Sequence, residues 1–117
     1  MYTVHLEGGP RRVNHAAVSI GGSVYSFGGY CTGENYNESR PIDVHALNTH
    51  NYRWRLVVPS EYSVCPFQRY GHTVVAHDGR VYLWGGRNDR TACHTLYCFD
   101  PSTIPSTLKK IIIQLDS

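Results

Sequence analysis

An internal repeat with an offset of 57 residues constrains this chain more than any other feature. In that register Arg12-Val13-Asn14-His15 aligns with Arg69-Tyr70-Gly71-His72. Further along, Val24-Tyr25-Ser26-Phe27-Gly28-Gly29 aligns with Val81-Tyr82-Leu83-Trp84-Gly85-Gly86. Six positions are identical without a gap: the arginine, the histidine, the valine, the tyrosine and both glycines. A period of this length indicates a fold built from similar supersecondary units packed side by side.

Each unit of the repeat reads as a set of short strands. Beyond the glycine pairs the register slips by five residues, so that the segment 43–48 lies over 95–100, and Trp54 follows six residues after Asn48. In the first unit we predict strands at residues 15–20, 24–28, 42–47 and 53–57. In the second unit we predict strands at 72–76, 81–84 and 95–99, with an unclear fourth. The predicted class is therefore all-β.

The turn residues support this prediction. Gly21-Gly22 and Asp78-Gly79 are two-residue turn signals between apolar runs, which is the pattern of a β-hairpin. The apolar segments beside them are β-branched and aromatic, as in strands covered on both faces. No segment has a sustained period of 3.6 residues, so we expect no substantial helix.

The repeated glycines and aromatic residues have a structural interpretation. Gly28-Gly29 and Gly85-Gly86 allow positive φ and the close approach of another backbone, as sheets converging on an axis require. A phosphate-binding loop is the alternative, but Gly-x-Gly-x-x-Gly is missing and no Lys-Ser or Lys-Thr pair follows. Large amphipathic side chains are expected to fill the space between neighbouring sheets: Tyr25, Tyr82 and Trp54.

The repeated histidines, His15 and His72, admit a catalytic or metal site as one reading. We favour the other, a turn residue that bonds within its own unit, because a catalytic residue has no reason to recur with the fold. Zinc is not expected, since Cys-x-x-Cys and His-x-x-x-His are missing and Cys93-His94 with Cys98 is too sparse for a closed site. With no nucleophile motif either, we expect a chain that is not an enzyme and has no cofactor.

Composition excludes several classes of protein. Eleven basic against nine acidic side chains give a net charge of +2, far from the excess of a dedicated nucleic-acid binder. No apolar run approaches the roughly 20 residues that span a bilayer, so no membrane association is expected. The start lacks the pattern of a secretory signal, so we expect reduced cysteines and a cytoplasmic or nuclear location.

The combination of Arg-x-x-His, Val-Tyr-x-Phe-Gly-Gly and an Asp-Val strand followed by a tryptophan resembles the kelch repeat. The resemblance runs from Thr3 to about Pro101. It implies a fragment of a six-bladed β-propeller, with about two four-stranded blades of which the second is incomplete. Residues 3–58 would hold an N-terminal strand and the first repeat, 66–101 a truncated second repeat, and 102–117 a divergent tail.

Segments 3–18, 24–31, 42–45 and 83–89 are further similar to the amino-terminal part of one member of this family. The resemblance implies a substrate receptor of a cullin-2 RING ubiquitin ligase, of a kind that reads carboxy-terminal degrons ending in glycine. Its partners would be protein or peptide ligands and, for the full-length protein only, elongin B/C and cullin-2. A chromatin-associated protein of meiotic recombination, or a cytoskeletal scaffold, is the alternative.

The second unit departs from the pattern after Asp100-Pro101, where Ser106 replaces the expected tryptophan. We therefore expect the fourth strand to be lost and the isolated chain to be marginally stable, because repeat folds need about three units. Residues 2–6 resemble a fourth strand of a blade that this sequence does not contain.

In kelch propellers the loop after the double glycine opens on the ligand-binding face, which gives the candidate site. Tyr30 and Tyr36 would supply aromatic contact area. Arg87, followed by Asn88 and Asp89, would pair with a carboxylate. Ordinary solvated loop side chains are the alternative interpretation of these residues.

Overall fold

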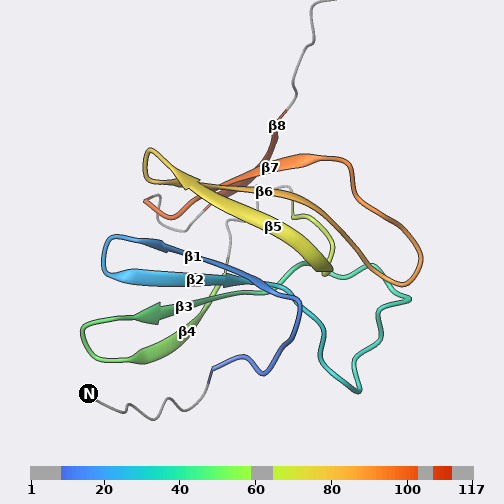
Figure 1. The fold of residues 1–117 in the computed structure, drawn as a ribbon, viewed down its shortest axis with the longest axis horizontal. Helices are drawn as coiled ribbons and strands as arrows, with labels where there is room; N and C mark the ends of the chain where they lie inside the picture. The colour runs from blue at the N-terminus through green and yellow to red at the C-terminus, as the bar shows by residue number, and fades with distance from the viewer. Residues whose placement is uncertain (1–8, 59–64, 103–106, 112–117) are drawn as a thin grey trace, which may run out of the picture.

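Eight strands form two four-stranded antiparallel sheets in the structure, a computed structural model that describes residues 9–58, 65–102 and 107–111 (Figure 1). Sheet 1 contains β1 (Ala16–Ile20), β2 (Ser23–Phe27), β3 (Val44–Asn48) and β4 (Arg53–Val57). Sheet 2 contains β5 (Tyr70–His77), β6 (Arg80–Arg87), β7 (Leu96–Asp100) and β8 (Thr107–Ile111). In both sheets the strands pair in chain order, and no described residue is helical. The predicted all-β class is confirmed.

The seven strands expected from the repeat are all present, and β4 has the predicted bounds. Two-residue hairpins join β1 to β2 and β5 to β6 at the predicted turns. Asp78 and Gly79 both have positive φ, 53° and 75°, as a type I′ turn requires. The strand β6 runs through Gly85-Gly86, whereas the sequence pattern predicts its end at Trp84.

The prediction that the second unit lacks a fourth strand is wrong. β8 pairs with β7 and completes sheet 2. Leu108 lies opposite Phe99 as Trp54 lies opposite Leu47, so leucine occupies the sheet position at which a tryptophan was expected. Ser106 and the strand proposed at residues 2–6 lie outside the described residues. A buried leucine fills the position because the packing needs an apolar side chain rather than tryptophan in particular.

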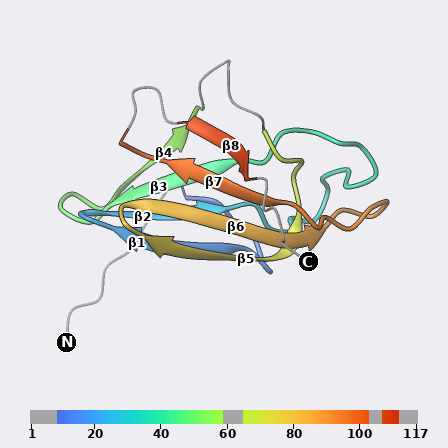
Figure 2. The ribbon, with the colours of Figure 1, turned by 90° about the horizontal axis from the view of Figure 1, so that it is seen from above.

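The two sheets pack face to face with their first strands together. Their backbones approach each other chiefly at β1 and β5, and β4 and β8 lie at the opposite edge (Figure 2). We call the side of a sheet that packs toward the next sheet along the chain its forward face, and the other side its backward face. The forward face of sheet 1 therefore packs on the backward face of sheet 2. This is the arrangement of neighbouring propeller blades.

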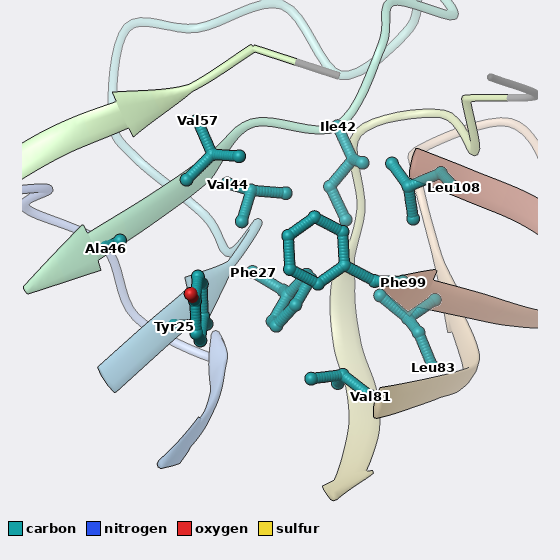
Figure 3. Packing of buried hydrophobic residues seen from close by; sticks show 10 residues of the cluster. All are labelled: Tyr25, Phe27, Ile42, Val44, Ala46, Val57, Val81, Leu83, Phe99 and Leu108. Atoms are coloured by element: carbon teal, nitrogen blue, oxygen red, sulfur yellow. The ribbon is translucent and has the colours of Figure 1, made fainter. Parts of the chain in front are cut away.

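One apolar core lies between these two faces (Figure 3). Phe99 is fully buried and meets Tyr25 and Phe27 edge to face, with ring centroids 5.5 and 5.4 Å away. Such aromatic pairs contribute about 0.5–1.5 kcal/mol each beyond the area they bury. The other buried members come from both sheets and from the loop before β3: Ile42, Val44, Ala46, Val57, Val81, Leu83 and Leu108.

Backbone groups also bond across the two sheets. The amide of Gly29 donates to the Arg69 carbonyl at 2.8 Å, and the amide of Gly71 donates to the Asn14 carbonyl at 3.0 Å. A Cβ on Gly28 would lie 2.8 Å from the same Arg69 oxygen, and Gly28 has a positive φ of 57°. The first glycine pair is therefore required for close approach of the next blade, as the repeat indicated.

His72 bonds across the interface and not within its own unit, which corrects the prediction made for this histidine. Its Nε2 donates to the carbonyl of Phe27 at 2.6 Å, because a carbonyl oxygen can only accept. Burial lowers the pKa of His72 from 6.5 to about 4, and its Nδ1 has no partner among the described residues. The neutral ring thus ties β5 to the end of β2, since a second proton would lie buried without an acceptor.

Candidate protein-binding surface

The loops that leave the two glycine pairs gather at one end of the molecule (Figure 1). One loop connects β2 to β3, and the other connects β6 to β7. They contact each other directly, because the amide of Asp89 donates to the carbonyl of Tyr36 at 2.9 Å. We call this end the loop face.

Three tyrosines from both units form an aromatic cluster on the loop face. Tyr30 stacks on Tyr36 with ring centroids 5.0 Å apart and planes 24° apart. Tyr70, from the second unit, meets both rings edge to face at 5.9 and 5.7 Å. Tyr30 is 39% exposed, so this ring presents aromatic surface to solvent while the other two hold it in place.

Arg12 anchors the longer loop through two carboxylates. Its guanidinium contacts both oxygens of Glu34, at 2.6 and 2.8 Å, and reaches Asp43 Oδ2 at 2.5 Å. Arg40 forms a second ion pair with Glu34. The hydrogen bond from Arg12 lowers the pKa of Glu34 to about 2 and, reciprocally, raises the pKa of Arg12. Both groups therefore stay charged at neutral pH and fix the loop as a bidentate pair.

The hydroxyl of Tyr36 organises the turn that carries Tyr30. It accepts from the Cys31 amide at 2.7 Å and lies 2.9 Å from both the Gly29 carbonyl and Glu34 Oε2. The Tyr36 side chain is only 2% exposed, and burial raises its pKa. Its role in this chain is to position neighbouring groups.

Asn88 plays the matching role in the shorter loop. Its side-chain oxygen accepts from the amides of Arg90 and Thr91 at 3.0 and 2.8 Å, an Asx-type turn. The next residue, Asp89, accepts a hydrogen bond from the Tyr70 hydroxyl at 2.8 Å, which raises the pKa of Tyr70. Asn88 is 1% exposed and Asp89 is exposed, so the first shapes the loop and the second lies on its surface.

The structure brings four of the five predicted contact residues into one connected group. Tyr30, Tyr36 and Asp89 are joined through Tyr70, and Asn88 holds the loop that contains Asp89. Arg87 precedes this loop, is exposed, and donates through Nε to the Asn88 carbonyl at 2.9 Å. Sequence reasoning missed Tyr70, whose only available signal was its place in the repeated Arg-x-x-His segment.

The repeated arginines differ in their surroundings. Arg12 has two carboxylate partners, whereas Arg69 is fully buried, donates to the carbonyls of Phe67 and Gly85, and lies over the Phe67 ring at 4.2 Å. Neither arginine is placed to meet an incoming ligand. Arg87 is exposed and borders the aromatic cluster, because it lies opposite Tyr70 in the pairing of β5 with β6.

This arrangement suits recognition of a peptide. An exposed tyrosine ring supplies apolar contact area at low entropic cost, and an exposed guanidinium can pair with a carboxylate through two hydrogen bonds. Within the described part of the chain, no three His, Cys, Asp or Glu side chains come together as metal ligands. The described residues also contain no helix long and apolar enough to cross a membrane.

Comparison with known proteins establishes the family. The model of the KLHDC2/KLHL20/DRC7 Kelch-repeats domain matches residues 6–114. The chain belongs to the kelch-repeat family. Kelch domain-containing protein 3 of Rattus norvegicus is 56% identical over 109 residues, which cover 87% of this chain and 28% of that protein. The Homo sapiens protein of the same name is 55% identical over the same length. Kelch repeat-containing protein 2 of Saccharomyces cerevisiae is 32% identical over 99 residues, 80% of this chain and 11% of that protein.

The kelch chain thus spans about 28% of the length of its mammalian relatives. Kelch repeats generally form non-catalytic modules for protein–protein interaction, and two four-stranded sheets fit a fragment of a β-propeller. The resemblance noted in the sequence is confirmed by these matches.

Proposed function

We propose that this chain contributes to the substrate-binding surface of a cullin-2 RING ubiquitin ligase, where its loop face binds the carboxyl-terminal residues of glycine-ended proteins. The observation that carries the proposal is the exposed Arg87, which lies opposite Tyr70 and so beside the cluster of Tyr30, Tyr36 and Tyr70. Elongin B/C and cullin-2 would be partners of the longer protein, in the cytoplasm or nucleus.

The chemistry of such a ligand fits the surface. A terminal carboxylate is a planar anion that a guanidinium binds bidentately, and glycine has no side chain to keep the peptide backbone from the tyrosine ring. A charge-assisted hydrogen bond contributes about 1.5–3 kcal/mol. Loss of the Arg87 contact would therefore weaken binding by roughly tenfold to a hundredfold.

Binding of a fluorescent peptide that ends in glycine with a free carboxylate tests the proposal. Arg87→Glu should weaken binding by at least tenfold, and amidation of the peptide terminus should have a similar effect. Arg90→Glu reverses the same charge in the loop that follows Arg87 and serves as the matched control, with a much smaller effect expected. Equal binding of the free and amidated peptides, or equal effects of the two variants, would contradict the proposal.

Assembly into a ligase is tested separately. Elongin B, elongin C and cullin-2 should co-purify with the full-length mammalian relative from cells. If they do not, the ligase role fails while peptide binding by the loop face can still stand.

A further inference from the structure

Tyr70 and Arg87 lie side by side at the edge of the loop face. They are direct partners in the antiparallel pairing of β5 with β6. Residues opposite each other in such a pair point to the same side of the sheet, with about 4.5–5.5 Å between their Cβ atoms. Arg87 donates through Nε to the Asn88 carbonyl at 2.9 Å, a bond that does not engage its two Nη groups. A hydroxyl donor and a guanidinium donor thus lie at adjacent positions.

The Tyr70 hydroxyl binds a carboxylate of the chain itself. It donates to Asp89 Oδ1 at 2.8 Å, while the Tyr70 ring is held in place by edge-to-face contacts with Tyr30 and Tyr36. A phenolic hydroxyl has one proton, so it can donate to one acceptor at a time. A carboxylate that reaches Arg87 from solvent must therefore either leave this hydroxyl unused or take it from Asp89.

The surroundings of Asp89 allow its side chain to be displaced while the loop stays in place. The Asp89 amide donates to the Tyr36 carbonyl at 2.9 Å, and the Asn88 side chain accepts from the amide of Thr91, so the backbone on both sides is fixed. The Asp89 side chain is exposed, so water can solvate its carboxylate after it leaves Tyr70. The displacement needs only a change of side-chain rotamer.

We propose that Asp89 is an internal competitor of the ligand. Its carboxylate holds the Tyr70 hydroxyl in the free chain, and the terminal carboxylate of a bound peptide takes that hydroxyl together with Arg87. This inference rests on the proposed function of the loop face. It makes Tyr70 a ligand-binding residue whose contribution is masked, because one hydrogen bond to a carboxylate is exchanged for another.

A double-mutant cycle on Tyr70 and Asp89 tests the exchange, with the fluorescent peptide that ends in glycine. Asp89→Ala should strengthen binding of the free-carboxylate peptide by about tenfold, because the Tyr70 hydroxyl no longer has to be released. Tyr70→Phe alone keeps the ring in the aromatic cluster and should change binding only slightly. Added to Asp89→Ala, the same change should weaken binding by about tenfold, because the bond to the ligand is then lost without compensation.

Charge alone would give a different pattern. Loss of a negative charge near Arg87 favours any anion, but by the same factor with and without Tyr70→Phe. Glu38→Ala removes the same charge from an exposed position of the β2–β3 loop and is the matched control, with little change expected. Carbon NMR of the Asp89 carboxylate gives a second readout: its signal should shift when the free-carboxylate peptide is added, and should not shift with the amidated peptide.

The outcomes separate the exchange from the proposed function. An equal gain from Asp89→Ala with and without Tyr70→Phe would assign the effect to charge and overturn the exchange. No gain from Asp89→Ala, or an Asp89 signal that stays unchanged on binding, would overturn it as well. In both cases a preference for the free carboxylate over the amide would leave the proposed function intact. Equal binding of the two peptides by the unmodified chain would contradict the proposed function, and the exchange with it.

Discussion

Truncation of Phe99 tests whether the two sheets share one core. Phe99 is fully buried between the sheets and contacts both Tyr25 and Phe27. Removal of a buried phenylalanine to alanine costs about 3–5 kcal/mol, from the lost transfer energy and the cavity left behind. A domain of this length has roughly 5–15 kcal/mol of unfolding free energy. Phe99→Ala should therefore remove a large part of it.

The repeat supplies a matched control. Leu47 is the counterpart of Phe99 on the backward face of sheet 1 and is only half buried. Leu47→Ala should cost about 1 kcal/mol, because only part of the leucine side chain is buried and little buried apolar surface is lost. Urea unfolding followed by circular dichroism measures the loss for both variants. With a typical slope of about 1–3 kcal/mol per molar urea, Phe99→Ala should lower the midpoint by roughly 1–5 M.

Which sheets lose stability in Phe99→Ala decides whether the two sheets share one core. Trp54 lies in sheet 1 and Trp84 in sheet 2, so single-tryptophan variants report each sheet. Phe99→Ala should destabilise both sheets together, although the substitution is in sheet 2. Equal losses for Phe99→Ala and Leu47→Ala, or a loss confined to sheet 2, would refute a shared core.

Three further changes probe the contacts between the loops and the sheets. The pKa of His72 is about 4 in the folded chain against 6.5 in the unfolded chain, so the unfolded state binds more protons between these values. The unfolding free energy should therefore be at its full value above about pH 6.5 and fall by up to roughly 3 kcal/mol toward pH 4, and His72→Gln should remove this slope in urea titrations. Tyr36→Phe should lower the stability by about 1–3 kcal/mol in thermal unfolding, because it leaves the Cys31 amide and the Gly29 carbonyl without the hydroxyl, whereas Tyr30→Phe should have little effect. Gly28→Ala and Gly85→Ala both place alanine at positive φ, but only the first meets a backbone oxygen, so Gly28→Ala should lower the urea midpoint further; equal shifts would contradict the close approach.

Much of the fold could be predicted from the sequence, because the repeat aligned residues that share one structural task. The glycine pairs, the two-residue turns and the β-branched segments located seven of the eight strands. Tyr25 was expected between sheets and is buried there. These features are local, or recur with the fold, and so can be read without knowing which sheets meet.

The fourth strand of the second unit could not be predicted because the repeat pattern predicts a tryptophan there, as Trp54 in the first unit. The packing position requires an apolar side chain of suitable reach, and Leu108 meets that requirement. The hydrogen-bond partner of His72 could not be predicted for a similar reason. The sequence of one repeat does not show that the accepting carbonyl, that of Phe27, lies in the preceding unit.

The residues predicted for the candidate site lie on or beside the loop face, but the roles of their side chains depend on burial. Tyr36 and Asn88 belong to short polar loops, which normally lie in solvent. Here each buries its side chain because it satisfies backbone groups of its own loop. Arg12 pairs with Glu34 and Asp43, which are distant from it in sequence, so no local sequence pattern predicts these ion pairs. Their contact with ligand stays a prediction.

Hydrogen exchange of two backbone amides tests most directly whether the sheets are neighbouring blades of one unit. The amides of Gly29 and Gly71 both bond across the interface, to Arg69 and Asn14. They should exchange only through global unfolding, with the same opening free energy as the ladder amides of β2 and β6. Faster exchange of Gly29 and Gly71, with both ladders still protected, would show that the sheets separate without unfolding and would contradict the account.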